Sequence, residues 1–138
     1  MTGNDGNDLI DGSAVLTGKL DLNGGAGFDS LIGGQGNDTL DGGLGNDNVK
    51  GGAGDDRAIW NWDAGVDTYD GEGGYDTLVI NFRSWTEFSA QAKDYESVTK
   101  AFSTGSQATV SGKVGNLTYR NFEYLAVVVG GTTVWEGP

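Results

Sequence analysis

Polar and apolar positions recur every nine residues through the first half of the chain. Each repeat has glycines at its first, second and fourth places, an aspartate at its sixth place and one apolar residue at its eighth. The regular repeats begin at Gly24, Gly33, Gly42 and Gly51. Imperfect repeats occupy Gly3–Asp11, Gly71–Val79 and, after two extra residues, Trp62–Asp70. The stretch 12–23 is about one repeat plus three residues, and its register stays open.

This pattern predicts one tight turn and one short strand in every repeat. Glycines at the first, second and fourth places permit positive φ and bring carbonyls close together, which is typical of a turn. Places seven to nine form a short strand whose eighth-place side chain points inward. Two repeats then make one coil, and stacked coils form a roll of parallel strands. The eighth-place residues form a thin apolar column: Leu31, Leu40, Val49, Ala58, Tyr69 and Leu78.

A different pattern begins after Val79 and predicts an amphipathic helix over residues 84–102. Ser84 and Glu87 form a capping box at its start. Apolar residues then follow at steps of three and four, at Trp85, Phe88, Ala92, Tyr95, Val98 and Phe102. We expect this face to cover the open end or one side of the roll. A membrane-surface helix is the alternative, but the polar face has no basic excess.

Antiparallel strands are predicted after the helix, over about 107–114, 117–120, 122–129 and 132–136. The segments Val114–Asn116 and Gly130–Gly131 read as hairpin turns between them. A solenoid needs a cap, because its end strands otherwise expose unpaired backbone. The chain is therefore predicted to have two regions, the roll at 1–79 and a capping and folding scaffold at 80–138.

Charge is distributed unevenly between these two regions. The net charge is −12, and residues 1–79 hold fifteen acidic and three basic side chains, whereas 80–138 hold five of each. Such an anionic surface excludes nucleic-acid binding. The sequence has no Cys and no His, which excludes disulfides, the usual zinc sites and Ser-His-Asp catalysis. The sequence lacks an apolar run long enough for a membrane span, and its first residues do not predict a secretory signal peptide.

The sixth-place aspartates predict a metal site between each pair of stacked coils. Repeats two apart share an edge of the roll, so a first row holds Asp8, Asp29, Asp47 and Asp67, and a second row holds Asp38, Asp56 and Asp76. Coils lie about 4.8 Å apart, and carboxylates that close repel unless a cation lies between them. The alternative is that these aspartates only form turns.

Calcium fits this oxygen-rich arrangement best, because it takes carboxylate and carbonyl oxygens together and tolerates irregular geometry. Neighbours within each row predict about five structural Ca²⁺ ions, at 8/29, 29/47, 47/67, 38/56 and 56/76. Further ligands are the turn carbonyls of Gly25, Gly27, Gly34, Gly36, Gly43, Gly45, Gly52, Gly54, Gly65 and Gly74. The apolar column is too thin to order so many glycines by itself.

The repeats resemble the calcium-binding RTX nonapeptide, GGxGxDxUx with U a large apolar residue, over about residues 3–79. The resemblance implies a mainly β fold, a right-handed parallel β-roll followed by a capping subdomain with one amphipathic helix and antiparallel strands. It also implies a secreted or cell-surface bacterial protein that a one-step secretion machinery exports unfolded and that extracellular calcium folds. The last residues do not resemble a secretion signal, so we expect an internal piece of a longer protein.

Two other functional classes are alternatives to this structural module. A polysaccharide-binding (alginate-like) or adhesin module would use calcium bridges, the aromatic residues of the second region, or the cations Arg83, Lys93, Lys113 and Arg120. An enzyme with paired carboxylates is a third possibility. We expect no catalytic residues, because metal engages the aspartates. We further expect a monomer without nucleic-acid or membrane partners.

Overall fold

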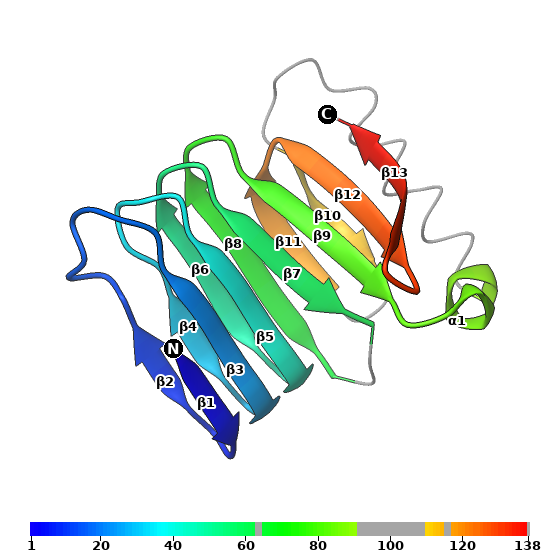
Figure 1. Ribbon diagram of the computed structural model, residues 1–138, viewed down its shortest axis with the longest axis horizontal. Coiled ribbons are helices and arrows are strands. Elements are labelled where there is room, and N and C mark those ends of the chain that lie inside the picture. Colours follow the sequence, from blue (N-terminus) through cyan, green and yellow to red (C-terminus); the bar gives the residue numbers. More distant parts are fainter. Residues whose placement is uncertain (63–64, 91–109, 115–116, 138) are drawn as a thin grey trace.

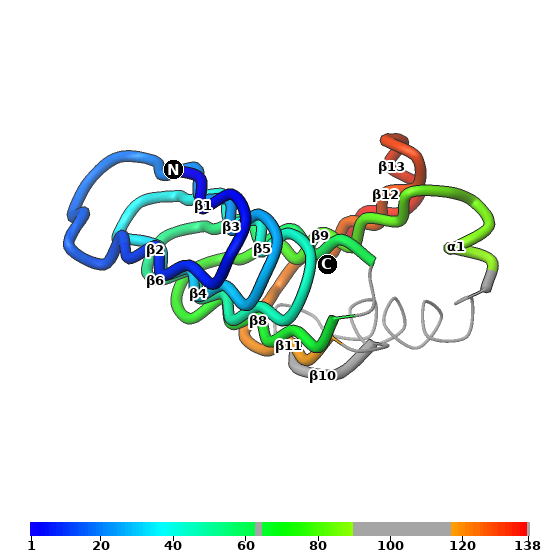
Figure 2. The backbone as a smooth tube through the Cα atoms, turned by 90° about the horizontal axis from the view of Figure 1, so that it is seen from below, coloured from blue at the N-terminus to red at the C-terminus, as the bar shows by residue number. Residues whose placement is uncertain are grey.

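The computed structural model describes residues 1–62, 65–90, 110–114 and 117–137. The chain winds back and forth between two β-sheets, which Figure 2 shows as two layers. Each sheet receives every second strand of the repeats, so neighbouring strands in a sheet are parallel. The mainly β, parallel roll that the repeats predict is therefore confirmed.

The first sheet has seven strands in the order β1-β3-β5-β7-β9-β12-β13 (Figure 1). Their bounds are β1 (Thr2–Asp5), β3 (Asp21–Gly27), β5 (Thr39–Gly45), β7 (Arg57–Asn61), β9 (Thr77–Phe82), β12 (Tyr124–Val129) and β13 (Thr132–Gly137). The second sheet has the order β10-β11-β8-β6-β4-β2. Its strands are β2 (Leu9–Asp11), β4 (Ser30–Ile32), β6 (Asn48–Ala53), β8 (Asp67–Gly73), β10 (Val110–Val114) and β11 (Leu117–Phe122).

The register between coils settles the stretch that the sequence left open. Leu22 lies beside Leu40, which lies beside Ala58, so Leu22 occupies an eighth place and Leu20 a sixth place. The three additional residues of 12–23 are accommodated in the turn before β3. The two additional residues later in the chain, Trp60 and Asn61, extend β7 and pair with β9.

The eighth-place column forms the core, as predicted. All six predicted residues are at most 3% exposed, and Leu22 joins them. The column continues into the second region, because Tyr119 lies beside Tyr69 and Leu125 beside Leu78. Larger side chains widen the core at that end, among them Trp60, Phe82 and Phe122.

The strands after the helix add one more coil to the roll. β11 pairs in parallel with β8, and β12 pairs in parallel with β9, so both sheets continue past the repeats. Among the described strands, only β10 and β13 are antiparallel to their partners, and they lie at the sheet edges (Figure 1). The hairpin at Gly130–Gly131 is confirmed, and both glycines have positive φ. Val114 pairs with Leu117, with the two turn residues between them outside the described ranges. A division of the chain at residue 80 stays a prediction.

The helix α1 (Trp85–Ala90) begins where the capping box predicts. Ser84 Oγ accepts the Glu87 N–H at 3.3 Å, and the Glu87 carboxylate accepts the Arg83 N–H at 2.8 Å, one residue earlier than in the predicted box. Phe88 packs edge-on against Phe82 of β9, which attaches this first turn to the core. The rest of the predicted helix, residues 91–102, lies outside the described ranges. None of the helical residues described here forms a segment long and apolar enough to cross a membrane.

Candidate metal sites

The sixth-place aspartates lie in two rows along the turns of the roll, one row on each edge. Within a row, the Oδ1 atom of each aspartate accepts the backbone N–H of the aspartate in the preceding coil. In the first row these bonds join Asp8 to Asp29 (2.9 Å), Asp29 to Asp47 (3.0 Å) and Asp47 to Asp67 (2.8 Å). In the second row they join Asp38 to Asp56 (2.7 Å) and Asp56 to Asp76 (2.8 Å). The predicted pairs are thus neighbours in space.

These carboxylates are buried, although they are acidic side chains. Six of the seven are at most 4% exposed, and Asp8 in the outermost coil is half-buried. Four of them have a buried Oδ2 atom with no hydrogen-bond partner: Asp8, Asp29, Asp56 and Asp76. A buried carboxylate oxygen without a partner is strongly unfavourable. A bound cation would remove that cost, so the four buried Oδ2 atoms without a partner indicate metal binding.

Asp38 and Asp67 each have a protein donor on Oδ2. Asp38 Oδ2 accepts the Gly34 N–H at 2.6 Å, and Asp67 Oδ2 accepts the Trp60 indole N–H at 2.6 Å. The spacing of the repeats predicted neither contact. Trp60 is one of the two additional residues, so the insertion brings a donor to the last aspartate of the first row.

Turn glycines in adjacent coils lie directly over one another. Glycine is required in these turns for two reasons, positive φ at some places and close approach of neighbouring atoms at others. Second- and fourth-place glycines have positive φ in three of the four regular repeats, among them Gly43 and Gly45, whereas Gly34 and Gly36 do not. A Cβ on Gly43 or Gly45 would meet the carbonyl oxygen of Gly25 or Gly27 in the preceding coil at 2.1 and 1.9 Å. The other predicted carbonyl ligands are stacked in the same way: the carbonyl oxygens of Gly34, Gly36 and Gly54 lie against Gly52, Gly54 and Gly74 of the next coil. Gly65 is buried in the turn before Asp67.

The sequence interpretation was also wrong about the first-place glycines. Gly24, Gly33, Gly42 and Gly51 do not have positive φ. They are needed for space. A Cβ on Gly51 would lie 2.5 Å from Asp56 Oδ2 and 2.5 Å from the Gly71 carbonyl oxygen. The carboxylate oxygen and a carbonyl oxygen of the next coil therefore converge on this glycine.

Negative charge accumulates along the second row. Burial raises the pKa of Asp76 to about 7, with further upward contributions from the charges of Asp56, Glu123 and Asp55. Burial likewise raises the pKa of Asp56 to about 6, and Asp38, Asp55 and Glu72 add to it. The cause is the same for both groups: the charged form is desolvated and surrounded by other carboxylates. A divalent cation at this edge would neutralise them.

The donor set suits a hard, oxygen-preferring ion. Among the described residues, no three His, Cys, Asp or Glu side chains gather into a metal cluster. Each predicted site offers two carboxylates, and its remaining ligands would be turn carbonyls. Calcium accepts such mixed oxygen ligands, whereas zinc prefers the nitrogen and sulfur that this chain does not supply here. The chemistry is charge neutralisation and cross-linking of neighbouring coils.

Sequence reasoning missed one acidic residue at a row end. Glu123 occupies the sixth place of the added coil, because Tyr124 and Leu125 lie beside Thr77 and Leu78. A signal was present: the order aromatic, acidic, any residue, Leu, apolar occurs both at 75–79 and at 122–126. No glycines precede Glu123 at repeat spacing, so the nonapeptide pattern does not find it.

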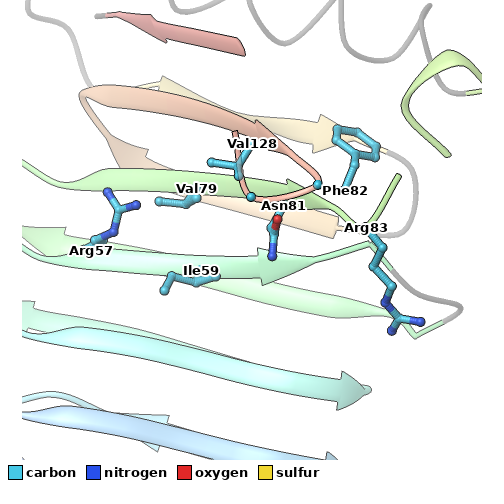
Figure 3. A pocket seen from close by; sticks show the side chains of 9 residues that line it. Arg57, Ile59, Val79, Asn81, Phe82, Arg83 and Val128 are labelled. Carbon is cyan, nitrogen blue, oxygen red and sulfur yellow. The ribbon is translucent and has the colours of Figure 1, made fainter. Parts of the chain in front are cut away.

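A shallow hollow of about 350 Å³ lies on the outer face of the first sheet. Ile59, Val79 and Asn81 line its middle, and Arg57 and Arg83 lie at its two ends (Figure 3). Of the cations considered for a polysaccharide, Arg120 is instead engaged by buried Asp70 at 2.6 Å. Lys93 and the Lys113 side chain lie outside the described part of the chain.

Comparison with known families agrees with this geometry. A family model for the RTX calcium-binding nonapeptide repeat, in four copies, matches residues 1–14, 23–58 and 63–78. Its two internal gaps fall on the insertions that lengthen the turn before β3 and extend β7. No curated protein and no solved structure matches the chain. RTX repeats bind calcium and form structural modules of secreted proteins. With the parallel solenoid and the two aspartate rows over the same residues, this match shows that the chain belongs to the RTX calcium-binding nonapeptide repeat family.

Proposed function

We propose that this chain is a calcium-dependent folding module, in which ions bound between stacked coils hold the roll together. The observation that carries the proposal is the set of buried Oδ2 atoms without partners on Asp8, Asp29, Asp56 and Asp76. In the unfolded chain these carboxylates are hydrated and far apart, so no preformed site exists. The free energy of calcium binding then becomes free energy of folding.

About five ions are assigned to the neighbouring pairs of the two rows, 8/29, 29/47, 47/67, 38/56 and 56/76. The carboxylates and the turn carbonyls of the stacked glycines would supply the ligands. The 8/29 site should be the weakest of the first row, because Asp8 is only half-buried in the outermost coil.

Secretion gives such a module its use. Without calcium, a net charge of −12 on a glycine-rich chain disfavours collapse and keeps the chain suitable for export in unfolded form. Outside a bacterial cell, calcium at millimolar concentration would fold it, in the affinity range of extracellular calcium modules. The family's occurrence in secreted proteins supports this location.

Circular dichroism with and without calcium tests the proposal. We expect a β-sheet spectrum in calcium at about 5–10 mM, severalfold above the weakest affinities (~10⁻³ M) of extracellular calcium modules, and a disordered spectrum after complete chelation. Magnesium at the same concentration should not restore the β-sheet signal, because it prefers a small octahedron and retains its waters. An unchanged spectrum after chelation would contradict the folding switch.

Two matched variants locate the effect. Asp56→Asn removes a charge shared by the 38/56 and 56/76 sites, so the calcium concentration at half-folding should rise about tenfold or more. Asp5→Asn removes the same charge from an exposed residue outside both rows and should leave the midpoint almost unchanged. Equal shifts in the two variants would mean that only net charge matters.

The hollow on the first sheet supports a second candidate function, binding of an anionic polysaccharide. Arg57 and Arg83 are both exposed at its ends and could engage carboxylates along an extended polymer (Figure 3). Titration with alginate oligomers in saturating calcium should then show binding that the double variant Arg57→Gln, Arg83→Gln weakens at least tenfold. A flat titration of the folded chain would leave calcium-dependent folding as its function.

A further inference from the structure

The coil added by β11 and β12 continues the second aspartate row with a glutamate. Glu123 Oε2 accepts the Asp76 N–H at 2.8 Å. Asp76 Oδ1 accepts the Asp56 N–H at the same distance, and Asp56 Oδ1 accepts that of Asp38 at 2.7 Å. Glu123 thus makes the contact that every aspartate of the row makes to the preceding coil.

A glutamate suits this position because its turn is short. Only Phe122 and Glu123 separate Asn121 from the strand residue Tyr124, whereas five residues separate Gly71 from Thr77 in the coil before. The backbone of the short turn does not follow the full nonapeptide path. The additional methylene of glutamate lets its carboxylate reach the Asp76 N–H nevertheless.

The backbone oxygen beside this position is also reproduced. A Cβ on Gly71 would lie 2.5 Å from Asp76 Oδ2 and 2.0 Å from the Asn121 carbonyl oxygen. The corresponding oxygens around Gly51 are Asp56 Oδ2 and the Gly71 carbonyl. Asn121 is fixed there, with φ of 58°, by a hydrogen bond from its side chain to Asp70 at 2.6 Å. The same two kinds of oxygen therefore converge between the last two coils.

The ends of the two rows differ in a way that points to a ligand. After Asp67, the next coil has Leu117 at the sixth place, and Asp67 Oδ2 accepts the Trp60 indole N–H. After Asp76, the next coil has Glu123, and Asp76 Oδ2 is buried without a hydrogen-bond partner in a residue only 1% exposed. In the first row, which ends at Asp67, the Oδ2 atom has a protein donor. In the second row, which continues to Glu123, Asp76 Oδ2 has none.

We propose that Asp76, Glu123 and the Asn121 carbonyl form a further calcium site, outside the nonapeptide repeats, that joins the C-terminal coil to the roll. This site rests on the proposed calcium-dependent function and adds one ion to those of the repeats. Its short turn offers fewer carbonyls than a nonapeptide does, so water completes the coordination and the site is weaker than 38/56. Calcium then holds β11 and β12 against β8 and β9.

Calorimetric calcium titration of the whole chain and of Glu123→Gln tests the site. The glutamine oxygen can still accept the Asp76 N–H, but it is a poorer calcium ligand than a carboxylate. We expect the variant to bind one ion fewer than the wild type, with the tighter sites unchanged. Glu136→Gln is the matched control, because Glu136 is exposed on β13 and its loss removes the same charge. It should bind as many ions as the wild type.

The outcomes separate the two proposals. A wild-type chain that binds no calcium overturns the proposed function and this site with it. A wild type that binds while Glu123→Gln binds the same number equally tightly, or loses no more than Glu136→Gln, overturns this site alone. If Glu123→Gln does not fold in calcium, Glu123→Asp replaces it. The shorter carboxylate should weaken the last ion at least tenfold, and unchanged affinity would count against the site.

Discussion

Gly51→Ala is expected to prevent the chain from folding at calcium concentrations that fold the wild type. The new Cβ would lie 2.5 Å from the Gly71 carbonyl oxygen and 2.5 Å from Asp56 Oδ2. The Gly71 carbonyl belongs to the backbone of a stacked coil and cannot rotate away. Moving the Asp56 carboxylate would disrupt the hydrogen bond from the Asp38 N–H to Asp56 Oδ1 and both metal sites to which Asp56 contributes. Overpacking of this kind costs about 3 kcal/mol, to which the lost calcium binding is added.

Gly73→Ala is the control for this variant, on the same edge and in the adjacent coil. A Cβ there would meet nothing closer than 3.8 Å, and Gly73 does not have positive φ. Calcium titrations followed by circular dichroism should give a wild-type midpoint for Gly73→Ala. Gly51→Ala should show no β-sheet transition below tens of millimolar calcium, which is about tenfold above the extracellular range. A normal midpoint for Gly51→Ala would show that the coils are not stacked as described.

The sequence predicts the roll because nine-residue spacing leaves few alternatives. An apolar residue at every eighth place gives the column of Leu31, Leu40 and Val49, and a spacing of eighteen places Asp29 beside Asp47. The role of first-place glycine could not be found in this way. Glycine permits positive φ and also leaves space, and only the positions of Asp56 Oδ2 and the Gly71 carbonyl show that space is what Gly51 supplies.

The second region was harder to predict because strand pattern does not determine strand direction. The alternation in 117–129 fits an antiparallel sheet as well as a parallel one, and the hairpin at Gly130–Gly131 favours the former. The hairpin is antiparallel, but β12 also pairs in parallel with β9, so that Leu125 lies beside Leu78. Within the repeats, the apolar column reaches only to Tyr69 and Leu78, so the open end of the repeats is covered best by strands that continue the column. Glu123 gains its position only through that pairing.

Acid is expected to act in opposite directions on the metal-free and the calcium-bound chain. The pKa of Asp56 is raised to about 6 and that of Asp76 to about 7, from an ordinary value of 3.8, in the absence of metal. A carboxyl whose pKa is raised by folding stabilises the folded state when it is protonated. That contribution is complete below the unfolded pKa and is lost as the pH rises through about 6 to 7. The metal-free chain should therefore gain β-sheet signal between pH 7.5 and pH 5.

Calcium has the reverse requirement, because it binds the same carboxylates only after they lose their protons. The groups that face Asp56 and Asp76 are themselves acidic, namely Asp38, Asp55, Glu72 and Glu123, and their charges add to the upward shift of the pKa of Asp56, of Asp76 or of both. Calcium titrations at pH 7.5, 6.5 and 5.5 should show the half-folding concentration rising about tenfold across this range. A midpoint that does not change with pH would mean that calcium, if it folds the chain, binds through oxygens other than these carboxylates.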